Sequence, residues 1–398
     1  MPSKWPTVEK PVPGRQAFSR SDPEAVLSQA AVLLILGAQA RGDQDTFGAR
    51  ASVAGLAGFA EFWPDEDFAL FERPRPGGPA GRVNVQRLRE GLAHRFGDWI
   101  FPEKATTADV LRAGTAAALP NLAQRAYDQT TPDASAELME TCLKHPEELI
   151  RVAAAASYSD MSTETERLTE ILADGCRSED ELVRGVAATA LWYVSPEHVV
   201  LNSLRTREGR ATSAGAGDTT LLVHGTWAGR VPGSSSTSPL WWEPGGDFHT
   251  HILQNVKPDL YSQPDRFGWS GDYSDSARAQ AATQLTTWVI AHKDQGLNLI
   301  THSHGGSAAM MATLGGLTIG ELVLLSCPVH IPKYIPDFTR IGKAVSVRVH
   351  LDLVILADRG GQKFKLSQMQ ENVLPLWFDH FATHNPATWN KYNVKTML

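Results

Sequence analysis

Cysteine is scarce in this sequence: there are three in 398 residues, Cys142, Cys176 and Cys327. Such an odd and widely spaced set does not form the disulfide framework of a small secreted protein, so we expect a reducing compartment. Long basic runs are also missing, and the formal net charge is −7. A nucleic acid or an anionic membrane needs a concentrated positive surface, so neither is an expected partner.

Long hydrophobic segments are missing as well. The longest apolar run, residues 30–40, is much shorter than the ~20 residues that a membrane-spanning helix needs. The N-terminal stretch "MPSKWPTVEKPVPGRQAF" contains prolines and charges but no apolar segment of the kind found in secretory signals. We therefore expect a cytoplasmic protein without an integral membrane segment.

The chain is too long for one ordinary hydrophobic core, which predicts two domains. Residues 1–204 carry helical patterns and are predicted to form an all-α domain. Residues 205–218 are polar and rich in glycine, which is typical of a linker. Residues 219–398 show a different rhythm and form the second predicted domain, which carries the catalytic candidates.

A partial repeat lies within the helical region. The segments "HPEELIRVAAAAS", from His145, and "SEDELVRGVAATAL", from Ser178, align so that Arg151 and Arg184 correspond. Each segment has a cap-like start, acids in the first turn and an alanine-rich face. Such a pair resembles a HEAT-like helical repeat over about residues 107–200, in which small residues let helices pack closely. Two ordinary amphipathic helices that look alike are the alternative.

Short apolar, β-branched segments alternate with helical patterns after residue 218. This alternation predicts an α/β fold, with a mostly parallel sheet covered by helices on both faces. The expected strands are residues 219–223, 266–269, 297–301, 321–326, 345–350 and 372–378, and helices are expected at 276–292 and 304–314.

The sequence "LNLITHSHGGSAAM" places Ser303 between a strand and a helix. In the G-x-S-x-G motif, a tight turn at this point lifts a serine hydroxyl above the edge of the sheet. Gly305 allows a close approach of backbone and helix, whereas Thr301 replaces the first glycine of the motif. Ser303 is therefore a candidate nucleophile, and a serine that only caps the helix is the alternative.

Donors for a developing oxyanion are expected on both sides of this serine. The strand 219–223 is followed by "HGTWAG", whose turn can direct backbone N–H groups of Gly225, Thr226 and Trp227 into the site. The residue after the nucleophile, His304, is expected to supply the other N–H group.

Acids and histidines follow in the order of a catalytic triad. Asp352 and His380 each lie two residues beyond an expected strand, which makes them the preferred acid and base. Asp358 and His384 are the alternatives, and Asp272 is a third, weaker acid.

This order and placement resemble the α/β-hydrolase superfamily over about residues 215–398. Within it, the sequence looks closest to bacterial lipase- or esterase-like proteins. These carry an "HGT-W" turn, a "WW-PGG-F" segment (here 241–248), a "WSG" segment (269–271), an acid in a "D-x-V" context (352–354) and a final "H-x-P-x-x-W" (384–389). The resemblance implies an α/β-hydrolase fold and hydrolysis of a small-molecule or lipid-like ester through an acyl-enzyme, with no cofactor.

Other candidate roles stay open at this point. Trp241 and Trp242 could wall the substrate pocket or pack on the sheet edge. His302 and His304 have a spacing that suggests a metal, but a third ligand is not evident, so no metal is expected. The rival class is an interaction protein, in which the helical array binds a protein partner and the hydrolase-like domain is silent. An amidase or thioesterase would use the same triad.

Overall fold

The computed structural model describes residues 139–206 and 219–398, except 141, 146, 160, 161, 163, 164, 233, 293–295, 351 and 377, together with 26, 27, 30, 31, 33, 34 and 37. The chain divides into two compact units, Met1–Gly175 and Cys176–Leu398. This division falls earlier than the domain end expected at residue 204, so the helices after residue 175 belong to the same unit as the sheet. Nearly all of the expected linker, 207–218, lies outside the described residues.

In the first unit, α7 (Glu148–Tyr158) packs against α8 (Thr165–Gly175). The alanines of α7 are buried, and their small side chains let neighbouring segments of the same chain approach closely. Gly37 shows how close the approach is, because a Cβ at this residue would lie 2.4 Å from the Cβ of Ser157. Residues 107–138 of the expected repeat region lie outside the described residues.

The two copies of the partial repeat share a local hydrogen-bond pattern. Arg151 Nη1 donates to the carbonyl oxygen of His145 at 2.8 Å, and Arg184 Nη1 donates to that of Ser178 at 2.7 Å. In both copies the backbone N–H two residues after the start donates to the side chain of the starting residue. The copies lie in different units, so stacking in a HEAT-like array stays a prediction.

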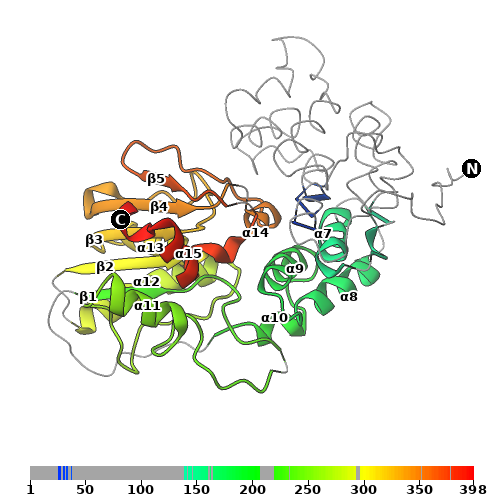
Figure 1. Ribbon diagram of the computed structural model, residues 1–398, viewed down its shortest axis with the longest axis horizontal. Coiled ribbons are helices and arrows are strands. Elements are labelled where there is room, and N and C mark those ends of the chain that lie inside the picture. The colour runs from blue at the N-terminus through cyan, green and yellow to red at the C-terminus, as the bar shows by residue number, and fades with distance from the viewer. Residues whose placement is uncertain are drawn as a thin grey trace, which may run out of the picture. The chain divides into compact units, whose positions relative to one another are not determined.

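The second unit is built on a five-stranded sheet whose order follows the chain, β1-β2-β3-β4-β5, with every neighbouring pair parallel (Figure 1). Its strands are β1 (Thr219–Val223), β2 (Leu297–His302), β3 (Ile319–Leu325), β4 (Ile341–Arg348) and β5 (Gln370–Val373). Its helices are α9 (Glu181–Val194), α10 (Val199–Ser203), α11 (Asp247–Asn255), α12 (Asp275–His292), α13 (His304–Leu314), α14 (Leu353–Ala357) and α15 (Pro386–Tyr392), with short 3₁₀ helices η3 (Phe338–Arg340), η4 (His380–His384) and η5 (Val394–Met397).

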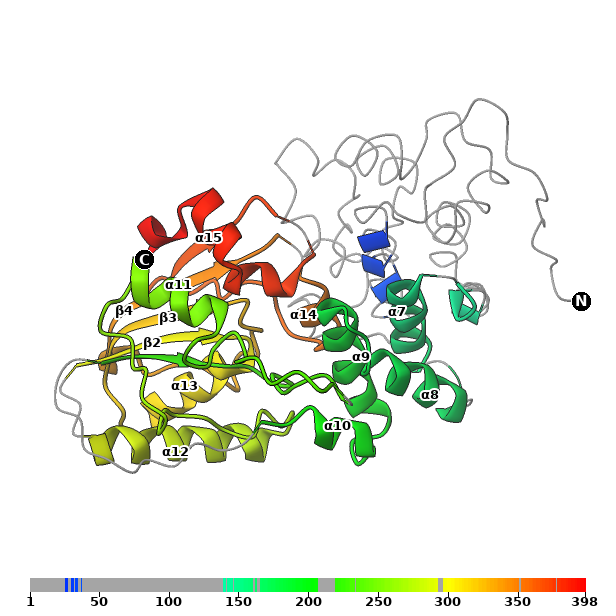
Figure 2. The ribbon, with the colours of Figure 1, turned by 60° about the horizontal axis from the view of Figure 1, so that its bottom comes forward.

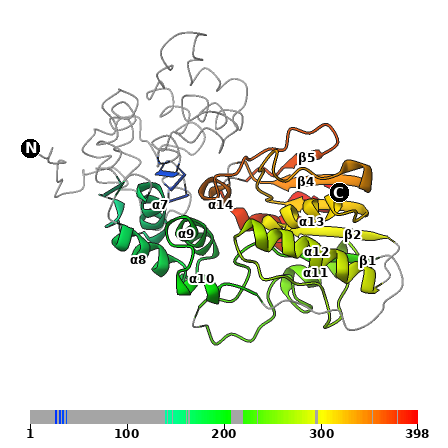
Figure 3. The ribbon, with the colours of Figure 1, turned by 180° about the vertical axis from the view of Figure 1, so that it is seen from behind.

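Helices cover both faces of this sheet, as the alternation of strand and helix patterns predicts. Leu221 and Leu299 face α12 and α13 in one apolar cluster, whereas Leu222 and Ile300 face α11 and α15 in another. Figure 2 shows these two helix layers on opposite sides of the strands, and Figure 3 shows α12 and α13 from behind. Burying each large apolar side chain stabilises the fold by roughly 1.5–3 kcal/mol, so the two clusters hold the helices against the sheet. Among the described residues, no helix combines the length and apolarity needed to cross a membrane.

The expected strand at 266–269 is wrong. The chain is irregular there, and the segment that pairs beside β1 is instead Leu260, which forms a parallel bridge with Thr220. Trp269 gives the physical reason, because its indole N–H donates to the carbonyl oxygen of His224 at 2.8 Å, beyond the end of β1. The segment therefore crosses the strand end and does not extend the sheet.

Candidate active site

Ser303 lies at a tight turn between β2 and α13. Its φ is 52° and its ψ is −134°, a strained conformation that a residue with a side chain rarely adopts. The Ser303 N–H donates to the carbonyl oxygen of Leu325 at 2.9 Å, which holds the turn against the end of β3. The arrangement is the strand–turn–helix setting that the motif requires of a nucleophile.

Glycines let the backbone pass close to this turn. A Cβ at Gly305 would lie 2.5 Å from the carbonyl oxygen of His224, and a Cβ at Gly225 would lie 2.6 Å from the Cβ of Ser303. Thr301, which replaces the first glycine of the motif, is accommodated because its hydroxyl donates to the carbonyl oxygen of Val323 at 3.0 Å. The turn at Ser303 therefore stays tightly packed although Thr301 replaces the first glycine of the motif.

Asp352 and His380 are hydrogen-bonded to each other. His380 Nδ1 lies 2.7 Å from Asp352 Oδ2, and both side chains are buried. The other oxygen, Oδ1, accepts the N–H groups of Val354 and Ile355, each at 3.0 Å, as the N-cap of α14. A carboxylate held in this way selects the imidazole tautomer with hydrogen on Nδ1 and leaves Nε2 available as a base.

Strand pairing brings the acid and the base together. After β5 ends at Val373, the chain continues beside the extension of β4, with the His350 N–H donating to the Leu376 oxygen and the Leu353 N–H to the Phe378 oxygen. Asp352 consequently forms a bridge with Phe378, two residues before His380. The expected strand 372–378 is therefore only partly right, because β5 ends at Val373 and Phe378 takes part only in an isolated bridge.

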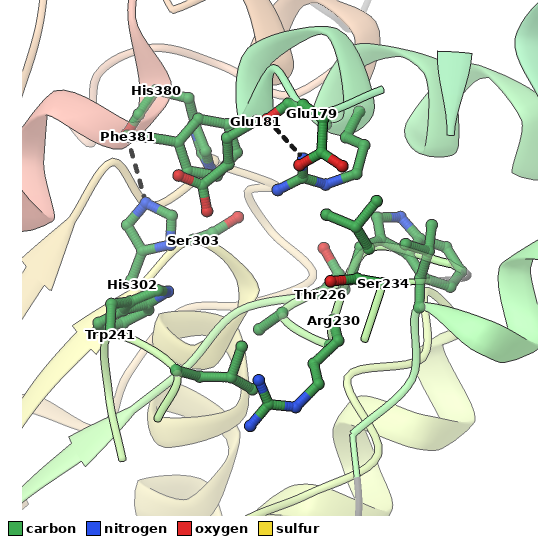
Figure 4. Close-up of a pocket in the computed structure, with 18 of the residues that line it drawn as sticks. Glu179, Glu181, Thr226, Arg230, Ser234, Trp241, His302, Ser303, His380 and Phe381 are labelled. Carbon is green, nitrogen blue, oxygen red and sulfur yellow. Dashed lines mark hydrogen bonds between the residues drawn. The ribbon is translucent and has the colours of Figure 1, made fainter. Parts of the chain in front are cut away.

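Ser303 and His380 line one pocket of about 350 Å³ (Figure 4). No hydrogen bond joins these two described side chains, and such a bond commonly tightens only when a substrate is bound. His302 also lines the pocket, and its Nε2 lies 3.3 Å from the carbonyl oxygen of His380. Burial lowers the pKa of His302 well below its usual value, so this ring is neutral.

His384, the alternative base, lies apart from the acid. Its ring stacks on Trp241, with centroids 4.2 Å apart and planes 8° apart, and its Nε2 lies 3.9 Å from Glu181 Oε2. Burial lowers the pKa of His384 to about 3, and its Nδ1 has no partner among the described residues. His384 therefore packs on Trp241, whereas His380 is the histidine hydrogen-bonded to the candidate acid Asp352.

The alternative acids also have other partners. Asp358 is buried and lies 2.8 Å from His304 Nε2 and 2.7 Å from His330 Nε2. Asp272 forms an ion pair with Arg205 at 3.0 Å. Of the three candidate acids, Asp352 alone is hydrogen-bonded to one of the two C-terminal histidines.

The expected oxyanion donors are only partly available. The Trp227 N–H donates to the carbonyl oxygen of Gly271 at 3.0 Å, so it cannot serve a substrate. Thr226 lines the pocket beside Ser303. His304 is the first residue of α13, so its N–H has no partner inside the helix. The remaining pair is the N–H of His304 and that of Thr226, with Gly225 kept small to admit Ser303.

The pocket contains residues that the sequence did not suggest. Glu181 and Arg184 reach it from α9, and the turn and loop at 226–241 close the other side. Burial raises the pKa of Glu181 to about 7, although 43% of its side chain is exposed and solvent reduces the shift. Gly185 permits this wall, because a Cβ there would lie 3.0 Å from Val354 and 3.1 Å from Phe381. Only such long-range packing places α9 here, and no local motif signals it.

The two candidate tryptophans have different surroundings. Trp241 lines the pocket and contacts His302 edge-on at 5.6 Å. Trp242 is 3% exposed and packs in the apolar cluster on the α11 face, with its ring 4.2 Å from that of His224. Trp241 is therefore the residue that a substrate can reach.

His304, His330 and Asp358 place possible metal-ligand atoms within 4.8 Å of one another. This set differs from the His302–His304 pair that the sequence suggested. The Arg278 guanidinium lies 3.0 Å from His304 Nε2 and already supplies positive charge to the cluster. A second cation at the same nitrogen would be repelled, so the cluster is better described as a hydrogen-bonded network.

Searches with family models, among curated proteins and among solved structures return no match for this chain.

Proposed function

We propose that this protein is a serine hydrolase that cleaves carboxylic esters. The observation that carries the proposal is the Asp352–His380 hydrogen bond of 2.7 Å in the pocket that also contains Ser303 at its strained turn. A serine hydroxyl is a poor nucleophile until a base removes its proton, and an imidazole oriented by a carboxylate is such a base.

The reaction follows from these positions. His380 Nε2 takes the proton as Ser303 Oγ attacks the ester carbonyl, and Asp352 stabilises the imidazolium that forms. The carbonyl oxygen becomes an oxyanion, which the N–H groups of His304 and Thr226 stabilise. His380 then gives the proton to the departing alcohol. Water attacks the acyl-enzyme by the same route, releases the acid and restores Ser303. The α/β-hydrolase fold belongs to the same proposal.

The experiment is turnover of p-nitrophenyl butyrate together with covalent labelling by a fluorophosphonate probe. We expect both in the wild-type chain and neither in Ser303→Ala. Ser346→Ala is the matched control, because Ser346 is a buried serine of β4 that does not line the pocket. No turnover and no labelling of the wild type between pH 5 and 9 would favour the silent interaction module.

The bond that is cleaved is tested separately. Amide and thioester hydrolysis would use the same triad, so the butyryl ester should be compared with the butyryl thioester and the butyryl anilide. A kcat/KM for the anilide above that for the ester would reject the esterase assignment and retain the serine mechanism.

A further inference from the structure

Asp358, at the C-terminal end of α14, contacts groups from several segments around the nucleophile turn. Its Oδ1 accepts hydrogen bonds from His304 Nε2, at 2.8 Å, and from the Tyr273 hydroxyl. Its Oδ2 accepts one from His330 Nε2 at 2.7 Å. Asp358 is 2% exposed, and charge-assisted hydrogen bonds away from water fix their partners strongly. The proposed reaction gives this carboxylate no role.

His304 connects Asp358 to the first turn of α13. Burial lowers the pKa of His304 to about 3, so the ring is neutral. Nε2 lies 2.8 Å from Asp358 Oδ1 and 3.0 Å from the Arg278 guanidinium, and we assign the hydrogen to Nε2 because the shorter contact is to a carboxylate, which can only accept. Nδ1, 3.2 Å from Ser307 Oγ, then accepts the hydroxyl hydrogen. Both ring nitrogens are thus held, and the backbone N–H of His304 is held with them.

Tyr273 connects the same carboxylate to the opposite side of the site. Its ring stacks on that of Trp227, with centroids 6.2 Å apart and planes 5° apart. Trp227 directly follows Thr226, so the position of its ring affects the turn that supplies the second N–H. The buried Arg278 guanidinium lies 4.7 Å from the centre of the Tyr273 ring and offsets the charge of Asp358.

We propose that Asp358 is a positioning residue that fixes the two oxyanion donors relative to each other, through His304 on one side and Tyr273 on the other. The inference builds on the proposed hydrolase function. Donors of this kind act only if they are held in place before the reaction, and a misplacement of about 1 Å can cost about 100-fold in rate. Asp358 does not touch the substrate, so its loss should lower kcat and leave KM almost unchanged.

The test is Asp358→Asn in the full chain, with p-nitrophenyl butyrate as substrate. Active sites are counted with the fluorophosphonate, so that misfolded protein does not enter kcat. We expect kcat per titrated site to fall about 10- to 100-fold, with KM within about twofold of the wild type. Asp275→Asn is the matched control, because Asp275 pairs with the same Arg278 at 3.0 Å but contacts neither His304 nor Tyr273, and its kcat should not change.

A double variant tests whether Asp358 acts through His304. We expect Asp358→Asn to lower kcat less in a His304→Asn background than in the wild type. If Asp358→Asn does not fold, Tyr273→Phe replaces it, because this change keeps the ring on Trp227 and removes only the hydroxyl; we expect a several-fold lower kcat.

The outcomes separate the two proposals. An unchanged kcat per titrated site in the folded Asp358 or Tyr273 variant overturns the positioning role even if the unfolding midpoint falls. Independent, multiplying effects of Asp358→Asn and His304→Asn also overturn it. The hydrolase function survives both of these results, whereas a wild type without Ser303-dependent turnover overturns the function and the positioning role together.

Discussion

Asp352 and Asp358 cap the two ends of one five-residue helix, α14. Asp352 accepts N–H groups at the start of the helix and binds His380, whereas Asp358 follows its last residue and binds His304. Every residue of α14 is buried, so the spacing between the two carboxylates is set by one short, tightly packed element. The two acids that the sequence offered as alternatives therefore both lie in the candidate site, with different partners.

Replacing Asp352 by Asn should remove nearly all activity. The amide can donate a hydrogen bond to His380 Nδ1 and thereby stabilise the tautomer with hydrogen on Nε2, which cannot accept the serine proton. We expect kcat to fall by about 10³- to 10⁴-fold. Asp272→Asn is the control, because Asp272 pairs with Arg205, and it should keep its activity. Steady-state kinetics on p-nitrophenyl butyrate give the answer, and a loss of less than tenfold for Asp352→Asn would argue against the triad.

His384 should make the protein less stable in acid. Its folded-state pKa is about 3 because the ring is buried, whereas an unfolded histidine titrates near pH 6.5. Between these values the unfolded chain binds more protons, so the contribution to stability is complete above about pH 6.5 and is lost as the pH falls toward 3. The slope from one such group is at most about 1.4 kcal/mol per pH unit.

His384→Phe tests this point because it keeps an aromatic ring on Trp241 and removes the titrating group. Urea unfolding at several pH values should give a shallower loss of stability below pH 6.5 than in the wild type. Other buried histidines, including His302 and His304, keep part of the slope. Turnover at pH 8 should stay within a few fold of the wild type, since His380 is the proposed base. An equally steep acid loss would show that His384 is not the source.

The sequence predicts the parts of the site that depend on local pattern. The bounds of β1 and α13 match the expected segments, because apolar periodicity and a glycine-rich start are readable within a few residues. What the sequence did not predict depends on contacts between distant segments. The Trp269 indole N–H donates to the carbonyl oxygen of His224, so a segment with a strand-like sequence crosses the end of β1. The Trp227 N–H donates to the carbonyl oxygen of Gly271.

The proposed role of Asp358 is not predicted from the sequence for the same reason. Its partners, His304, His330 and Tyr273, come from segments separated by between 28 and 85 positions in the chain. Spacing in the sequence does not show which of two nearby acids will meet which imidazole, because tertiary packing decides it. The position of Glu181 in the pocket also depends on tertiary packing, because α9 packs against Val354 and Phe381.

Gly305→Ala should damage both stability and activity. The added Cβ would lie 2.5 Å from the carbonyl oxygen of His224 and 2.7 Å from that of Val223, and backbone atoms cannot move away cheaply. We expect a loss of about 1–3 kcal/mol in the free energy of unfolding, as for other overpacked sites, together with a displaced Ser303. Gly315→Ala is the control at the other end of α13, where the nearest atom would lie at 3.3 Å. Equal free energies of unfolding in urea for the two variants would contradict the close approach of Gly305 to the backbone of His224.

Trp241→Ala should change the substrate preference, whereas Trp242→Ala should lower the stability of the fold. Trp241 lines the pocket, so its removal should change the preference among p-nitrophenyl acetate, butyrate and octanoate. We expect a roughly tenfold shift in relative kcat/KM, which corresponds to about 1.4 kcal/mol of transition-state binding energy. Trp242 is buried in the apolar cluster beside α11, so its removal should cost about 3–5 kcal/mol of stability. Its ester preference per titrated active site should match that of the wild type. Urea unfolding and the three esters distinguish the two roles, and a changed preference in Trp242→Ala with unchanged stability would reverse the assignment.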